Sequence, residues 1–145
     1  MRILVLSLIG LLVAGTASAE AKKPHSKHRP FQPVVRQDVA EYAGEYIGTD
    51  PPLVVMVQNA GGGKLDVEVR KDGETITIRS PQVTGAVLSG TIKNGDNQIE
   101  TFEGVFGVRD MNGIRAFGLL LNETVRVNQD LVVHRIFCKL AEEPE

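Results

Sequence analysis

From Tyr42 onward, apolar and polar residues alternate along most of the chain, which is the pattern of strands that bury one face. In residues 64–70, for example, Leu65, Val67 and Val69 alternate with charged side chains. The pattern predicts about nine strands, at residues 43–48, 53–59, 64–70, 75–79, 84–93, 98–109, 114–121, 124–127 and 131–140.

Residues typical of tight turns separate these runs. Asp72-Gly73, Asn94-Gly95 and Asn112-Gly113 supply the positive φ angles that two-residue hairpin turns need. The segments 60–63 and 128–130 are read in the same way. Because short connections make sequence neighbours adjacent in a sheet, the chain is expected to form an antiparallel meander.

The predicted fold class is all-β: a small antiparallel meander β-barrel of about eight or nine strands, preceded by a short helical turn. Asp38 can cap that turn, which runs through Tyr42, with Glu41 completing a capping box. A meander has two open edges, and closure into a barrel removes them. Four glycines inside predicted strands fit the bends of a small barrel: Gly90, Gly104, Gly107 and Gly118. A two-sheet β-sandwich is the alternative, and the pattern leaves open whether a barrel would be filled or hollow.

The first nineteen residues have the three parts of a secretory signal peptide. Arg2 provides the positive start, residues 3–14 form an apolar run, and the small residues Ala17 and Ala19 precede the expected cleavage before Glu20. The run is shorter than the roughly 20 residues of a spanning helix. No other segment is long and apolar enough, so no transmembrane helix is predicted.

Cysteine usage bears on the destination of the exported chain. Cys138 is the only cysteine, so no internal disulfide can form. Small animal secreted domains usually depend on disulfides, whereas bacterial envelope proteins often do without them. We therefore expect a secreted or periplasmic bacterial protein.

Charge divides the mature chain into a basic segment and an acidic domain. Residues 20–36 carry five Lys and Arg against one Glu, together with three prolines, and are predicted to form a disordered linker. Residues 37–145 carry 10 basic against 17 acidic residues, a net charge of −7; within them, residues 37–141 are the expected barrel domain and 142–145 an acidic tail. Nucleic acid binding is not expected, but the linker could make weak contact with an anionic surface.

The sequence shows no recognised catalytic or metal-binding motif. His25 and His28 lack a third ligand, so no metal site is predicted. His134 and Cys138 share a strand face but stand roughly 13 Å apart, too far for a nucleophile and its base. No catalytic residue and no cofactor are therefore assigned.

Residues 42–46, Tyr-Ala-Gly-Glu-Tyr, and residues 63–67, Gly-Lys-Leu-Asp-Val, resemble the opening of the lipocalin-like barrels associated with serine β-lactamase-type hydrolases. The resemblance extends from Tyr42 to about Val69. It implies a lipocalin-like barrel with an accessory, non-catalytic role. Tyr46 stands where true lipocalins carry a tryptophan.

These observations favour an exported, non-enzymatic binding module that holds a small apolar ligand or an envelope protein. The predicted ligand-binding residues are Tyr46, Phe106, Phe117 and His134. His134 shares the face of Val132 and Ile136, so it is expected inside the barrel, either bonded to the backbone or a tyrosine, or lining a ligand cavity. The alternatives are an enzyme with an unfamiliar site near His134, or a structural envelope protein held by its basic tail.

Overall fold

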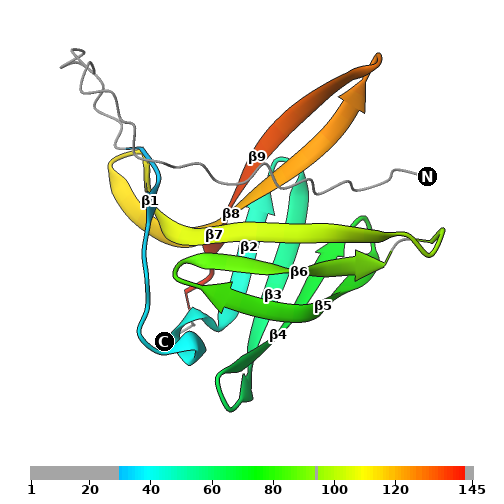
Figure 1. Cartoon of the computed structure of the whole chain (residues 1–145). Coiled ribbons are helices and arrows are strands. Elements are labelled where there is room, and N and C mark those ends of the chain that lie inside the picture. The colour runs from blue at the N-terminus through cyan, green and yellow to red at the C-terminus, as the bar shows by residue number, and fades with distance from the viewer. Residues whose placement is uncertain (1–29, 94, 143–145) are drawn as a thin grey trace.

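Eight antiparallel strands close into a barrel in the computed structural model, which describes residues 30–93 and 95–142 (Figure 1). Each strand pairs with the next along the chain, and the last pairs with the first. The strands are β2 (Gly44–Thr49), β3 (Pro52–Gly61), β4 (Lys64–Lys71), β5 (Glu74–Thr84), β6 (Val87–Lys93), β7 (Ile99–Met111), β8 (Ile114–Val127) and β9 (Asp130–Leu140). The all-β barrel prediction is confirmed, and the alternative of a β-sandwich is excluded.

The turn chemistry explains why the hairpins form where they do. Asp72 and Asn112 have φ angles of 53° and 53°, and the glycine that follows each also has a positive φ. Asn128 and Gln129, at 51° and 78°, make the two-residue turn between β8 and β9. In each case both central residues have the positive φ of a type I′ turn. The predicted turn at Asn94 includes a residue outside the described part of the chain.

Most predicted strand ends lie within about three residues of the observed ones, and two strands differ by more. The segments 114–121 and 124–127 are one continuous strand, β8, because Asn122 and Glu123 stay extended and pair with β9. Strand β5 continues past Arg79 to Thr84 through a register shift. A change of side-chain polarity alone does not end a strand when its backbone remains paired.

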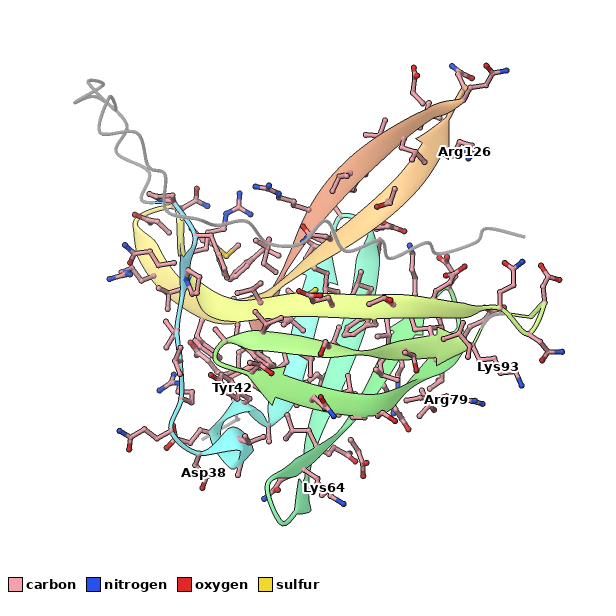
Figure 2. All side chains as sticks on the ribbon, in the orientation of Figure 1. Asp38, Tyr42, Lys64, Arg79, Lys93 and Arg126 are labelled. Carbon is pink, nitrogen blue, oxygen red and sulfur yellow. The ribbon has the colours of Figure 1, made fainter. Side chains whose placement is uncertain are left out.

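The predicted helical turn is present as a 3₁₀ helix, η1 (Val39–Tyr42). The Asp38 side chain accepts a hydrogen bond of 2.9 Å from the backbone N–H of Ala40, as an N-cap residue does. This cap directs Tyr42 into the barrel, where its side chain is fully buried. Figure 2 labels Tyr42, the last residue of η1.

The last residues of the predicted linker are part of the fold. Strand β1 (Gln32–Pro33) pairs with β7, and the Val34 N–H donates to the Phe106 carbonyl at 3.0 Å. The Arg36 N–H donates to the Tyr42 hydroxyl at 2.6 Å. The prediction of disorder through residue 36 is therefore wrong from residue 32 onward. Strand β7 continues beyond its last residue paired with β6, and β1 pairs with the edge of β7 that this leaves open. The predicted signal peptide at residues 1–19, the first ten residues of the predicted linker and residues 143–145 lie outside the described residues.

A glycine at position 107 permits the close approach of β1. A β-carbon built there would overlap the Gln32 carbonyl and the Phe31 ring. Gly107→Ala is expected to displace β1 and lower the free energy of unfolding by about 1–3 kcal/mol, as overpacking does. Urea denaturation followed by circular dichroism measures this change. Gly95→Ala is the control, since its β-carbon would meet open space; equal denaturation midpoints for the two variants would contradict the role of Gly107.

Strands β8 and β9 extend well beyond the barrel as a two-stranded ribbon (Figure 1). Pairing of β8 with β7 ends at Leu121, whereas pairing with β9 continues to the turn. We call residues 122–135 the arm. Figure 2 shows Arg126 near its far end. No helix in the described ranges is long and apolar enough to cross a membrane.

Candidate functional site

The described residues fill the barrel interior with large side chains. Tyr42, Tyr46 and Phe106 are all fully buried. The rings of Tyr42 and Phe106 stack with centroids 4.2 Å apart, and the Tyr46 ring lies 5.5 Å from that of Phe106. Towards the other end, the void bounded by Phe102 and its neighbours measures only about 10 Å³. The interior among these residues therefore has no room for an organic ligand.

The buried tyrosine hydroxyls have structural partners. Tyr46 donates to the Tyr42 carbonyl at 2.6 Å, and burial raises the pKa of the Tyr46 hydroxyl well above its ordinary value. The Tyr42 hydroxyl lies 3.2 Å from the Val34 carbonyl and 3.1 Å from the Gly85 carbonyl, within reach of donating to either. These hydroxyls tie the 3₁₀ helix and the N-terminal segment to the barrel.

Cys138 is also part of the core. Its side chain is fully buried, and burial raises the pKa of the thiol to about 12. A thiol with that pKa carries almost no thiolate at neutral pH, and the thiolate is the nucleophilic form. Cys138 therefore behaves as a small apolar core residue.

An ion pair lies at the end of the barrel from which the arm leaves. The Lys71 Nζ is 2.9 Å from Glu123 Oε1, and the two side chains are only 16% and 10% exposed. Lys71 ends β4 and Glu123 lies within β8, so the pair joins two strands that are not neighbours in the sheet.

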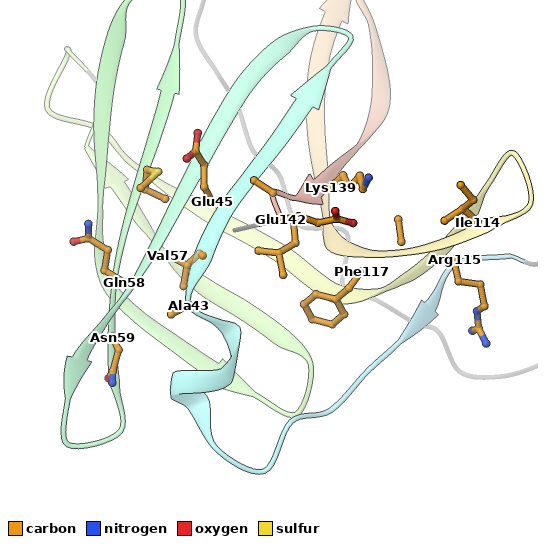
Figure 3. Close-up of a pocket in the computed structure, with 15 residues that line it drawn as sticks. Ala43, Glu45, Val57, Gln58, Asn59, Ile114, Arg115, Phe117, Lys139 and Glu142 are labelled. Atoms are coloured by element: carbon orange, nitrogen blue, oxygen red, sulfur yellow. The ribbon is translucent and has the colours of Figure 1, made fainter. Parts of the chain in front are cut away.

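An open groove at one side of this core has a volume of about 900 Å³. It lies between β2 and β3 on one side and the first residues of β8 on the other (Figure 3). Val57 and Phe117 line its opposite sides. The apolar lining residues are Ala43, Met56, Val57, Ile114, Ala116, Phe117, Leu140 and Ala141.

The groove exists because β9 is shorter than β8 at this end. Pairing of β8 with β9 begins at Gly118, opposite Lys139, and β9 ends at Leu140. Residues 114–117 of β8 pair with β7 on one edge, and no described strand pairs with their other edge. The chain beyond Leu140 instead follows β2, where the Ala141 N–H donates to the Glu45 carbonyl at 2.8 Å.

Charged groups of both signs lie around this apolar surface. Glu45 and Glu142 supply negative charge, and Lys139 and Arg115 supply positive charge. The guanidinium of Arg36 lies 4.7 Å from the centroid of the Phe117 ring, a cation–π contact that fixes that ring from one side. The groove is therefore apolar inside and balanced in charge at its rim.

The structure separates the four residues predicted to bind a ligand. Tyr46 and Phe106 belong to the filled core. Phe117 is half-buried and lines the groove, with its ring 6.4 Å from each of those two rings. Of the four residues, the groove thus contains only Phe117.

The prediction that His134 lies inside the barrel is wrong. Its face was read correctly, since Ile136 and Cys138 on the same face are buried. At His134, however, β9 has already left the barrel, and the side chain is exposed on the arm opposite Glu123. The alternation of side chains continues unchanged from barrel to arm, so it does not reveal where the barrel ends.

Among residues 30–93 and 95–142, no three His, Cys, Asp or Glu side chains are grouped to hold a metal ion. His25 and His28 lie outside these ranges. No protein-family model, curated protein or solved structure matches the chain. The likeness to lipocalin-like barrels stays a prediction.

Proposed function

We propose that this protein is an exported, non-enzymatic binding module that holds an extended peptide segment of a partner protein in the groove. One observation carries the proposal: an apolar groove of about 900 Å³ runs beside an edge of β8 with which no described strand pairs. A strand edge of this kind offers backbone N–H and C=O groups to an added strand.

The filled interior supports a site away from the centre of the barrel. A small ligand carried in the manner of hollow barrels needs an enclosed cavity, and Tyr42, Tyr46 and Phe106 occupy that volume here. The groove has a suitable volume for a ligand but is open along its length. Openness beside a strand edge suits an extended peptide better than a small molecule, which binds best when most of its surface is enclosed.

The binding mode follows from strand geometry. A peptide lying along residues 114–117 would bond to the β8 backbone, and its alternate side chains would point to one face. Those that face the groove would contact the half-buried ring of Phe117. The charges of Glu45 and Lys139 at the rim would set the position of the peptide more than its affinity. The preferred peptide is thus apolar at every second position.

The other parts of the proposal have separate support. Export is supported by the signal-like pattern of residues 1–19 and by the lone cysteine. A non-enzymatic role is supported by the structural use of three polar core groups, namely the buried thiol of Cys138 and the bonded hydroxyls of Tyr42 and Tyr46.

Peptide binding in the groove can be tested by substituting two exposed isoleucines, one in the groove and one outside it. Ile114 begins β8 in the groove and is 69% exposed, and Ile99 begins β7 outside it and is 72% exposed. Heptapeptides selected on the wild-type protein from a displayed library should carry apolar residues at alternate positions. Ile114→Asp is expected to weaken their binding about tenfold or more, close to 1.4 kcal/mol, and Ile99→Asp to leave it within about twofold. Fluorescence anisotropy measures both.

Two outcomes would contradict the proposal. One is that no peptide is enriched on the wild-type protein. The other is that Ile114→Asp and Ile99→Asp bind the selected peptides equally well. If no peptide is enriched, binding of the apolar dye N-phenyl-1-naphthylamine distinguishes the remaining possibility. Saturable binding of the dye to the wild-type protein, lost in Ile114→Asp, would favour a small apolar ligand instead.

A further inference from the structure

The arm has two strand edges with which no described strand pairs. Residues 122–127 of β8 and 130–135 of β9 pair with each other and with no other described segment. A two-stranded ribbon without a third strand or a core beneath it is marginally stable in water. An arm of this kind is stabilised when another strand joins its edge.

The β9 edge is the more apolar of the two. Leu131, Val132 and Val133 follow one another there and are 66%, 38% and 38% exposed. Edge strands are usually protected by proline, lysine or a β-bulge. Residues 130–135 contain neither proline nor lysine, and the pairing with β8 runs without a shift in register. The charged residues of this edge, Asp130 and Arg135, lie at its two ends and leave the apolar centre without such protection.

We propose that this edge pairs with the same edge of a second copy of the chain, antiparallel and centred on Val132. The two arms would then form one four-stranded sheet. When two copies of one strand pair antiparallel, the two-fold axis between them is perpendicular to the sheet. Each residue then lies opposite a residue of the other copy whose side chain points to the same face of the sheet. Symmetric pairing is therefore limited to registers centred on a single residue.

The register centred on Val132 matches the side chains of the two copies. Val132 lies opposite Val132, and Leu131 opposite Val133 on the other face of the sheet. Asp130 lies opposite His134, so a carboxylate, which accepts hydrogen bonds, meets an imidazole N–H donor at each end of the paired segment. Apolar pairs and hydrogen-bonded polar pairs stabilise antiparallel strands.

The neighbouring registers lack this complementarity. Centring on Val133 places Leu131 opposite Arg135 and Val132 opposite His134. Centring on Leu131 places Asp130 opposite Val132. A strand from a different protein could pair with this edge even if the edge were not complementary to itself. The self-complementary register centred on Val132 therefore favours a second copy of the chain as the partner. This interface involves none of the groove-lining residues, so its existence does not depend on peptide binding.

Cysteine cross-linking of the full mature chain tests the register. Val132→Cys should form a covalent dimer on treatment with diamide, because opposite residues lie about 4.5–5.5 Å apart, within the span of a disulfide. Leu131→Cys or Val133→Cys alone should not, since like residues would then be diagonal, roughly 7–8 Å apart. A mixture of these two variants should cross-link. The native Cys138 is buried and contributes no background.

Sedimentation velocity tests the association without cross-links. The wild-type chain should shift from monomer to dimer as its concentration rises about a hundredfold. Val132→Asp should remain monomeric, because it places two carboxylates opposite each other. Val127→Asp, on the same face of the arm but on β8 and 46% exposed, should still dimerise. Circular dichroism checks that both variants fold.

A wild-type chain that stays monomeric over this range would overturn the proposal. So would a dimer in which Val132→Cys does not cross-link, or in which Val127→Asp disrupts association as strongly as Val132→Asp.

Discussion

Replacing Phe106 with alanine is expected to lower the free energy of unfolding by about 3–5 kcal/mol, the range for removing a large aromatic side chain from a core. The Phe106 ring is fully buried and contacts three other rings, those of Tyr42, Tyr46 and Phe117. Its removal leaves a cavity between strands held by their backbone bonds, so the walls can close only partly. Urea denaturation followed by circular dichroism gives the value.

Met111→Ala is the control for this variant. Met111 ends the same strand but is 42% exposed, so its loss should change stability by no more than about 0.5 kcal/mol. A loss below about 1 kcal/mol for Phe106→Ala would show that the interior is loosely filled, which would leave room for a ligand inside the barrel.

Replacing Lys71 with methionine is expected to destabilise the protein by about 3 kcal/mol. The substitution leaves the carboxylate of Glu123 only 10% exposed and removes the ammonium group 2.9 Å from it. Since little water reaches that carboxylate, most of the lost interaction is not replaced. The effect is placed at the lower end of the usual range because both side chains retain some contact with solvent. Thermal and urea denaturation near neutral pH measure it.

The double variant Lys71→Met/Glu123→Leu distinguishes an uncompensated charge from lost packing. Replacing both partners with apolar groups removes the buried charge, so the double variant should recover most of the stability lost by Lys71→Met. Arg70→Met is a control, since Arg70 precedes Lys71 on β4 and its ion pair with Glu68 is largely exposed. A double variant less stable than Lys71→Met would show that the ion pair itself holds this end of the barrel together.

Much of the fold could be predicted because it depends on local patterns. Alternation in residues 64–70 reveals a half-buried strand whatever its neighbours are, and Asp72-Gly73 requires a turn whatever strands it joins. Closure followed from the need to remove sheet edges. At Gly118 a β-carbon would overlap the Cys138 carbonyl and the Phe137 ring, which explains why larger side chains are excluded at this position.

The candidate site could not be predicted in the same way because it depends on strand lengths and register. Phe117 was identified as an aromatic residue within a strand, but Val57 and Ala43 join it only because β9 ends at Leu140 and leaves the edge of β8 uncovered. His134 was misplaced for a related reason, since its strand continues after the barrel has ended. Alternation gives the face of a residue and carries no information on which other strands reach it.

Chemical-shift mapping of the ¹⁵N-labelled protein, titrated with a selected heptapeptide, tests the central claim that binding occurs in the groove of a filled barrel. The largest amide shifts are expected at residues 114–117 of β8 and at Gly44 and Glu45 of β2, which line the groove. Amides of Leu88 and Phe102, whose side chains lie in the core, should change little. Shifts concentrated at those core positions, with residues 114–117 unaffected, would instead place the peptide inside the barrel.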